Sequence, residues 1–332
     1  MTPYCTVLYD AAPIAGRMNE DAYLVQQTPT LQRFVVVDGA AQRIPTQRTA
    51  DLFRGAGLRA TGAVYAARTI IETAMINPSL TPRQIMLAAN TALRTALEDV
   101  YGELSAQHIA AQEPDAAPHL AGDPRLVRLA LPVAVATILE IDPVRGAYQF
   151  AHAGDTTLLA WHADGRVVAL TQDQMRRYDE AAVRHALSIQ RETGAPRLAD
   201  VLSGPAANAV NWQNGLYHNY VSENGAPDPE RGVGVVNGLP DLRHYIQTGG
   251  GALDAYAGFI LLTDGAMWPT PLDESRAQMN ARLRHMLTLM RQEGLAAYGQ
   301  ALRAEEAADA DLVRYPRFKV HDDCTALFIA LT

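Results

Sequence analysis

Two apolar segments of this chain end in the same dipeptide, Asp-Gly. Phe34–Val37 runs into Asp38-Gly39, and Ile260–Thr263 runs into Asp264-Gly265. The first segment is a continuous apolar run, typical of a strand that is buried on both faces. Such a strand fixes its terminal Asp at the edge of a sheet, and the Gly lets the backbone come close to a ligand. Either pair alone is typical of an ordinary turn, so its meaning depends on what accompanies it.

Three further acidic positions lie beside expected strands. Glu20-Asp21 precedes Ala22–Val25, Gly154-Asp155 follows Tyr148–Ala153, and Asp322-Asp323 leads into the last strand. A single acidic pair in a turn is usually solvated surface. Five acidic positions at strand ends together favour a site for Mg²⁺ or Mn²⁺, which bind carboxylate, carbonyl and water oxygens.

Strand and helix patterns follow one another along the chain. Strands are expected at Cys5–Tyr9, Ala22–Val25, Phe34–Val37, Ala134–Ile141, Tyr148–Ala151, Leu158–Trp161, Val167–Leu170, Phe259–Thr263 and Cys324–Leu331. Helices are expected within Leu58–Ile76, from Thr81 to Tyr101, near Glu180–Arg191, and at about Ser275–Arg291 and Leu295–Ala308. The pattern predicts a sheet-rich core flanked by helices.

One helix has a clear start. Thr81 suits the N-cap, Pro82 the first turn, and Gln84 reaches back to complete a capping box. Residues 113–124 are expected to form a polar loop. No repeat or linker is visible, so residues 1–332 are expected to form one domain, with a loosely patterned insert at about 172–238.

Charge and cysteine content narrow the class of protein. The net charge is −8 and no basic stripe is present, which argues against nucleic-acid binding. Cys5 and Cys324 are the only cysteines, so a reducing compartment is expected. The start of the chain lacks a signal-peptide pattern, and the longest apolar stretch, Leu129–Leu139, is too short to cross a bilayer. We therefore expect a cytoplasmic protein without a membrane partner.

Other metal and nucleotide motifs are absent from the sequence. The nine histidines form no His-x-x-x-His or His-x-Glu motif, which argues against a zinc hydrolase. His321-Asp322 lacks the upstream His pair that a His-Asp phosphohydrolase would have. No Gly-Lys-Ser/Thr element for a P-loop occurs.

The order of the acidic motifs resembles the type 2C, or PPM, family of protein phosphatases. The resemblance rests on Asn19–Ala22, Val37–Gly39, Gly154-Asp155, Thr263–Gly265 and Asp322–Thr325, with Leu170–Gln174 resembling the segment that leads into the family's flap. It spans about residues 15–331. It implies an α+β fold with a central antiparallel β-sandwich flanked by pairs of antiparallel helices, in α-β-β-α layers. It also implies hydrolysis of phosphoserine and phosphothreonine in proteins by a water activated between two Mn²⁺ or Mg²⁺ ions, without a covalent intermediate.

The resemblance assigns metal roles around the first Asp-Gly pair. Asp38 would bridge both metals, and the Gly39 carbonyl would contact one of them. Glu20 would bind the second metal directly or through water, and Asp21 would orient the ligands.

The remaining motifs would complete the metal site. Asp264 and Asp322 would hold the first metal, and Asp322 is preferred over Asp323 because the family places the ligand first in that pair. Asp155 matches the position that, with Asp264, can take a third and weaker metal.

The sequence departs from the family in three places. Arg17 would grip the substrate phosphate, but it lies three residues before Glu20, one fewer than usual. Ala40 stands where some members carry a His that protonates the leaving group, so water or another side chain must do this. Gly154-Asp155 continues with Thr156-Thr157 and not with the commoner ending.

Two alternatives stay open at this point. The chain could be a catalytically inactive relative that binds or senses a phosphoprotein, or a phosphatase of a small phosphate ester. The sequence names neither the physiological substrate nor the oligomeric state.

Overall fold

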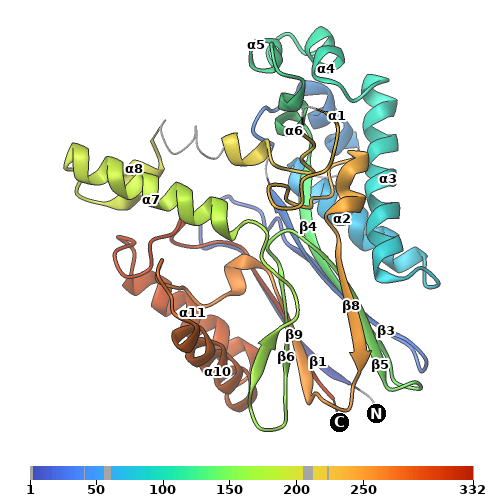
Figure 1. Ribbon diagram of the computed structural model, residues 1–332, viewed down its shortest axis with the longest axis vertical. Helices are drawn as coiled ribbons and strands as arrows, with labels where there is room; N and C mark the ends of the chain where they lie inside the picture. Colours follow the sequence, from blue (N-terminus) through green and yellow to red (C-terminus); the bar gives the residue numbers. More distant parts are fainter. Residues whose placement is uncertain (1–2, 41, 56–60, 205–211, 223, 332) are drawn as a thin grey trace.

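The computed structural model describes residues 3–40, 42–55, 61–204, 212–222 and 224–331. Two five-stranded sheets lie at its centre (Figure 1), and every strand pairing within them is antiparallel. The first, called the β1 sheet, contains in order β1 (Tyr4–Asp10), β10 (Cys324–Ala330), β9 (Gly258–Leu262), β6 (Thr157–Trp161) and β7 (Val167–Ala169). The second, called the β3 sheet, contains β2 (Ala22–Gln27), β3 (Gln32–Ala40), β4 (Val133–Asp142), β5 (Ala147–Ala153) and β8 (Gln247–Ala252).

The strand β3 is buried on both faces, as its apolar run predicts. Phe34 and Val36 point toward the other sheet and pack with Leu261 and Leu327 of β9 and β10. Alternate residues of the same strand, including Val35, point outward into a second core formed with helices. The strand β3 therefore contributes side chains to two cores, one between the two sheets and one between its sheet and the helices.

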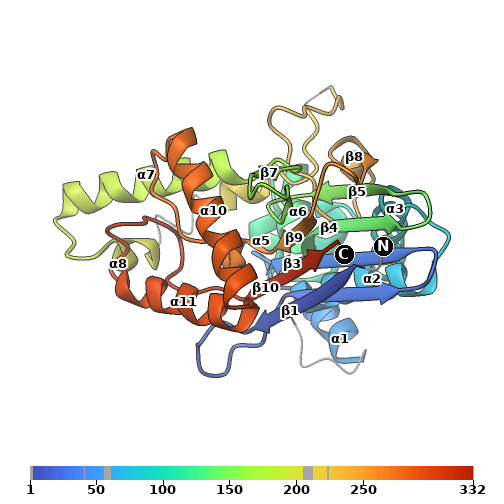
Figure 2. The ribbon, with the colours of Figure 1, turned by 90° about the horizontal axis from the view of Figure 1, so that it is seen from below.

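A pair of helices covers the outer face of each sheet (Figure 2). The pair α2 (Gly62–Ile76) and α3 (Pro82–Tyr101) packs on the β3 sheet, and α10 (Arg276–Gln292) and α11 (Leu295–Ala308) pack on the β1 sheet. The expected α+β fold, a β-sandwich between helix pairs, is confirmed. The capping box is also confirmed, because Thr81 accepts from the Gln84 N–H and the Gln84 side chain accepts from the Thr81 N–H.

Several short elements were not expected from the sequence. They are α1 (Gln47–Gly55), α4 (Ala106–Gln112), α5 (Ala117–Leu120), α6 (Val127–Ala130), α8 (Leu198–Leu202), the strand β8, and the 3₁₀ turns η1 (Pro124–Leu126), η2 (Pro240–His244) and η3 (Asp264–Ala266). The expected loop at 113–124 thus contains the helix α5. Three consecutive glycines give β8 almost no strand propensity, yet Gly249 lies against the ring of Phe150 on the paired strand, where no side chain would fit.

The region 172–238 holds the helix α7 (Arg176–Thr193), longer than expected, and α8; both extend away from the sandwich (Figure 1). The start of the helix expected within Leu58–Ile76 lies partly outside the described residues, and α2 begins at Gly62. Among the helices that the structure describes, none combines the length and apolarity needed to cross a membrane.

Candidate active site

The strand directions bring the acidic motifs to one end of the sandwich. Strands β3 and β5 both pair antiparallel with β4, so their final residues lie at the same edge and carry Asp38 and Asp155 there. Strand β2 is antiparallel to β3, with Ala22 opposite Val37, so the preceding acidic pair reaches that edge too. In the β1 sheet, β9 ends beside the start of β10, which brings Asp264 close to the last acidic pair.

The glycines of the two Asp-Gly pairs permit a close backbone approach. A Cβ on Gly39 would lie 2.8 Å from the carbonyl oxygen of Glu20. A Cβ on Gly265 would overlap the carbonyl of Asp323 and lie 2.9 Å from the Cβ of Asp322. Each glycine therefore lets its strand end pack directly against one of the other acidic pairs.

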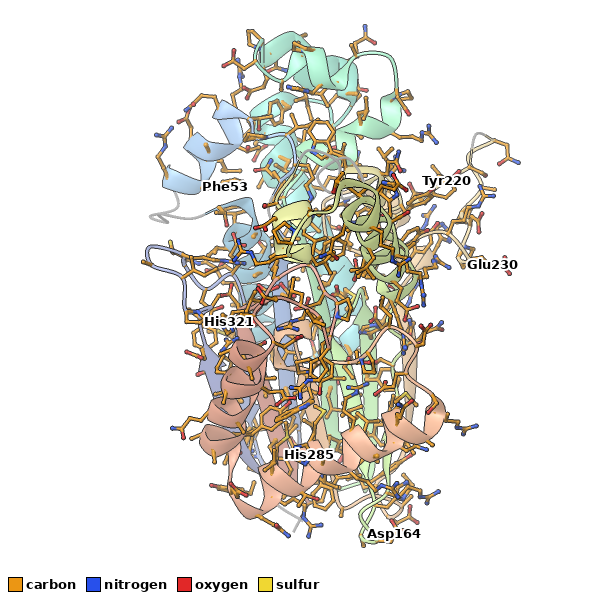
Figure 3. The ribbon with its side chains drawn as sticks, turned by 90° about the vertical axis from the view of Figure 1, so that its left-hand side faces the viewer. Phe53, Asp164, Tyr220, Glu230, His285 and His321 are labelled. Atoms are coloured by element: carbon orange, nitrogen blue, oxygen red, sulfur yellow. The ribbon has the colours of Figure 1, made fainter. Side chains whose placement is uncertain are left out.

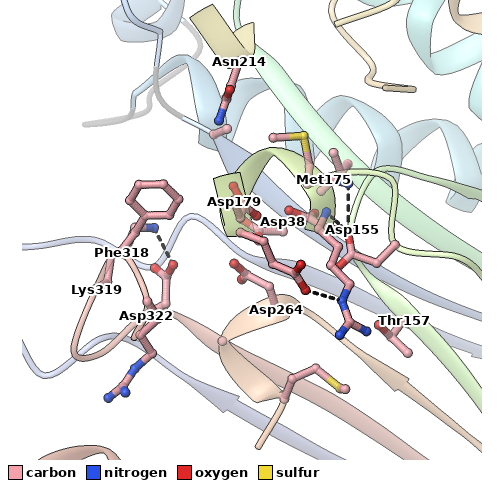
Figure 4. Close-up of a pocket in the computed structure, with 18 of the residues that line it drawn as sticks. Asp38, Asp155, Thr157, Met175, Asp179, Asn214, Asp264, Phe318, Lys319 and Asp322 are labelled. Carbon is pink, nitrogen blue, oxygen red and sulfur yellow. Dashed lines mark hydrogen bonds and ion pairs between the residues drawn. The ribbon is translucent and has the colours of Figure 1, made fainter. Parts of the chain in front are cut away.

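The acidic positions open into a cavity of about 950 Å³. Of the residues expected at the site, the structure brings together in its lining Arg17, Glu20, Asp38, Gly39, Asp155, Asp264 and Asp322. Figure 4 shows the carboxyl groups of Asp38, Asp155, Asp264 and Asp322 around one part of this cavity.

Asp21 and Asp323 lie buried behind the cavity wall. Asp323 accepts the backbone N–H groups of Ala12 and Glu20, at 2.8 Å each, so both of its oxygens are used to hold the N-terminal segment. Asp21 accepts from the Thr263 hydroxyl at 2.8 Å. This arrangement leaves Asp322, and not Asp323, facing the cavity.

The enclosed carboxyl groups raise one another's pKa. Enclosure in the cavity wall, followed by the charge of Asp264, raises the pKa of Asp38 well above its usual range. The same two causes raise the pKa of Asp155. Enclosure and then the charge of Asp322 raise the pKa of Asp264. A cluster of this kind attracts cations, because positive charge relieves the repulsion among the carboxylates.

Protein cations already contact part of the cluster. Arg17 Nη2 lies 3.1 Å from Asp322 Oδ1, and the ammonium group of Lys319 pairs with Asp322 Oδ2 (Figure 4). The Glu20 carboxylate accepts from the Thr61 hydroxyl. Within the described part of the chain, no three His, Cys, Asp or Glu side chains converge on one metal position.

The donor set nevertheless suits hard divalent cations. All of its side-chain donors are carboxylates, which Mg²⁺ and Mn²⁺ prefer. Asp155 Oδ1 and Asp21 Oδ1 are buried and have no hydrogen-bond partner among the described residues. An unsatisfied buried carboxylate oxygen is costly, and a cation in the cavity would satisfy that of Asp155, which lines it.

The sequence analysis assigned no role to three charged residues that lie beside the acidic cluster in the cavity, Asp173, Asp179 and Lys319. Asp173 lies within the segment that resembles the entrance to the flap, so that segment could have indicated it. Asp179 follows on α7, where enclosure and then the charge of Asp173 raise its pKa to about 8. Lys319 is the only lysine of the chain, which was the one signal that could have drawn attention to it.

His321 has a structural partner. It lies beside α11 (Figure 3), with its Nδ1 at 2.7 Å from Glu306 Oε2 of that helix. The pairing agrees with the view that His321-Asp322 is not the motif of a His-Asp phosphohydrolase.

A family model described as protein phosphatase 2C matches residues 12–305 of this sequence. The chain belongs to the protein phosphatase 2C family. The family is one of divalent-metal-dependent protein serine/threonine phosphatases that act on phosphorylated proteins, so the expected family and enzyme class are confirmed. The match includes four of the five acidic motifs and ends before Asp322. No curated protein sequence gives a significant match.

Solved structures of phosphatases resemble the chain at low sequence identity. The serine/threonine phosphatase PstP/Ppp of Mycobacterium tuberculosis is 14% identical, with 100% of this chain and 99% of that chain covered and a TM-score of 0.48. Stp1 of Staphylococcus aureus is 14% identical, with coverages of 100% and 96% and a TM-score of 0.48. RsbX in complex with magnesium is 11% identical, with coverages of 100% and 96% and a TM-score of 0.48.

Proposed function

We propose that this member of the protein phosphatase 2C family hydrolyses phosphoserine and phosphothreonine in proteins with the help of two divalent cations, Mn²⁺ or Mg²⁺. The observation that carries the proposal is the gathering of Asp38, Asp155, Asp264 and Asp322 from both sheets into one cavity. Chance placement of four carboxyl groups in one cavity, three of them with a raised pKa, would be costly to stability without a function.

Each residue has a proposed task. Asp38 would hold both cations, with the carbonyl of Gly39 on one of them. Asp264 and Asp322 would hold the first cation and Glu20 the second, while Asp155 would share a third, weaker site with Asp264. When bound, the cations would activate a water and neutralise charge on the phosphate.

Two residues act around these ligands. Asp21 is held by the Thr263 hydroxyl and would keep the neighbouring Glu20 oriented. Arg17 lies 3.1 Å from Asp322 Oδ1 and 4.0 Å from Glu20 Oε2, and its guanidinium would bind a phosphate that enters the site. Ala40 offers no proton, so the leaving oxygen would receive one from water or another cavity side chain.

The rest of the chain fits this role. We propose that residues 1–332 work as one catalytic domain, and that 172–238 borders the site as a flap, because Asp173, Asp179 and Asn214 line the cavity.

Both cysteines are free thiols, which suits a cytoplasmic location.

The proposal is tested by replacing one ligand. Asp264→Asn keeps the shape of the side chain and removes its charge. Loss of a residue that only hydrogen-bonds to a metal ligand typically lowers metal affinity or activity by roughly 10- to 100-fold. Because Asp264 is a proposed ligand itself, we expect Mn²⁺ affinity and phosphopeptide turnover to fall by more than that. Calorimetry measures the binding, release of phosphate from a phosphothreonine peptide measures turnover, and circular dichroism checks the fold.

Asp254→Asn is the matched control, because Asp254 is exposed and lies outside the cavity lining. Equal Mn²⁺ affinity and turnover in the two variants would contradict the assignment of Asp264.

One observation favours an inactive binding protein as the second candidate. Both oxygens of Asp322 pair with protein cations, Arg17 and Lys319. Failure of the wild-type chain to bind Mn²⁺ would support that candidate, whereas Mn²⁺ binding with turnover of small esters alone would indicate a metabolite phosphatase.

A further inference from the structure

The cavity has a second group of polar residues that carry donors and positive charge. Arg43, Asn214 and His218 line it together with the carboxylates. They come from three places: the loop after β3, the helical residues 212–215, and the segment that follows. A volume of about 950 Å³ exceeds what one phosphothreonine side chain needs, since cavities of about 300–1,000 Å³ hold whole drug-sized ligands. The cavity therefore has room for more than the phosphate that reacts.

Asn214 is a buried donor without a partner. The residue is 8% exposed, and its Nδ2 group finds no acceptor among the described residues. Figure 4 shows its side chain extending into the cavity. A buried amide that lacks a hydrogen bond destabilises the fold, so a ligand acceptor here would recover that loss.

His218 presents a second unpartnered nitrogen. Its Nδ1 is buried and makes no hydrogen bond to the residues that the structure covers. Burial, followed by the nearby charges of Arg43 and Arg128, lowers the pKa of His218 to about 3, so the ring is neutral at pH 7. Arg128 itself is held by the carbonyls of His218 and Asn219. A neutral ring can donate one N–H to a ligand.

Arg43 supplies the charge. Its backbone N–H donates to the Leu129 carbonyl, which fixes the start of the side chain, while its guanidinium lines the cavity and has no ion pair within the described ranges. Burial lowers the pKa of Arg43, and the charge of Asp179 acts in the opposite direction. With its pKa raised to about 8, Asp179 is largely protonated at pH 7 and does not cancel this charge.

We infer that Arg43, Asn214 and His218 form a subsite that binds a second anionic group of the substrate, close in sequence to the residue that is dephosphorylated. The group is a phosphoryl or a carboxylate, because a guanidinium fork and N–H donors suit both. The substrate class is then a phosphoprotein with an acidic or doubly phosphorylated segment. This inference rests on the proposed phosphatase function.

Kinetics test the subsite through peptide preference. Three phosphothreonine peptides are compared, with neutral neighbours, with Glu neighbours and with a second phosphoserine. The wild type should prefer the last two in kcat/KM, and Arg43→Gln should reduce that preference about tenfold, which is the loss of one charge-assisted hydrogen bond. The effect should fall on KM, because a remote contact contributes equally to ground state and transition state. Whether Glu or phosphoserine gives the larger preference identifies which anion is bound.

Arg48→Gln is the matched control. Arg48 lies five residues further on, is exposed and does not line the cavity, and its loss changes the net charge equally. The control should keep the wild-type preference. Equal preference for all peptides in the wild type, or equal loss in both variants, would overturn the subsite.

A binding measurement separates this inference from the phosphatase proposal. Inorganic phosphate is titrated into ¹⁵N-labelled protein in EDTA, where the unneutralised carboxylates repel phosphate from the neighbouring Arg17 and Lys319, and the signals of Asn214 report binding at the donor group. Saturable shifts of the Asn214 side-chain amide signals would give the affinity for phosphate. An affinity about tenfold weaker in Arg43→Gln, and unchanged in Arg48→Gln, would support the subsite even if the enzyme proves inactive. Absence of saturable shifts in the wild type would overturn it.

Discussion

Lys319 is a cation built into a cluster of acids. Its ammonium group pairs with Asp322. Burial alone would lower the pKa of Lys319, but the charges of Asp322, Asp264 and Asp38 raise it, so the group is charged at every physiological pH. Any divalent cation that uses Asp322 must compete with this group. Lys319 is thus placed to weaken metal binding, and also to contact a phosphate once Asp322 has been taken by metal.

The competition predicts the effect of removing the charge. Lys319→Met keeps the length of the side chain, and we expect the affinity for Mn²⁺ to rise about two- to fivefold, since a half-exposed ion pair contributes up to about 1 kcal/mol. Titration calorimetry measures this affinity. Lys319→Arg is the control that retains the charge, and its affinity should stay near that of the wild type. Weaker binding of Mn²⁺ to Lys319→Met would show that no such competition exists.

At the residue scale, the carboxylates were predictable and their partners were not. Asp38 and Asp264 could be found because each ends an apolar run, so the local pattern alone fixes its place at a sheet edge. Arg43 lies in a loop and Asn214 in a single helical turn, and neither segment has such a pattern. Their position in the cavity depends on contacts between distant segments, which local sequence does not encode.

At the element scale, α7 brings a further acid to the cavity. Asp173 accepts the N–H groups of Met175 and Arg176, at 2.8 and 2.9 Å, and so orders the start of the helix. One turn later Asp179 faces the cavity, with its pKa raised to about 8 by enclosure and by the charge of Asp173. The segment thus brings carboxyl groups to the site from outside the sandwich.

The raised pKa of Asp179 predicts how stability depends on pH. A folded-state pKa above the unfolded value favours the protonated folded form, so this contribution is present below about pH 4 and is lost as the pH rises toward about 8. In EDTA, the melting temperature should therefore fall over this range. Asp179→Asn should melt higher than the wild type at pH 8 and close to it at pH 4. Equal melting temperatures at pH 8 would contradict the raised pKa.

The predictability of the elements follows their length and pattern. The helix α3 was predicted because a capping box and a four-residue apolar repeat agree. The strand β8 was missed because its glycines carry no strand signal, and its pairing with β5 places Gly249 against the ring of Phe150, a contact between distant segments. The helices α1 and α4 are short, and although Ser105 caps α4, seven residues are too few to show an apolar repeat.

At the scale of the whole molecule, the site joins the two sheets. Asp38 and Asp155 come from the β3 sheet, and Asp264 and Asp322 from the β1 sheet. Cations between them would hold together the two layers that the apolar core already joins. The sandwich was predictable from strands near both chain ends and from the resemblance to a family. The group formed by Arg43, Asn214 and His218 was not predictable, because two of these residues reach the cavity only through the fold of the region 172–238.

The central claim is that the carboxylate cavity hydrolyses phosphoproteins with the help of divalent cations. The direct test is release of phosphate from a phosphothreonine peptide by the purified wild-type chain, with Mn²⁺, with Mg²⁺ and with EDTA. We predict turnover with at least one of the metals and none in EDTA. Equal turnover in EDTA, or no turnover with either metal in a folded protein that calorimetry shows to bind no Mn²⁺, would contradict the claim.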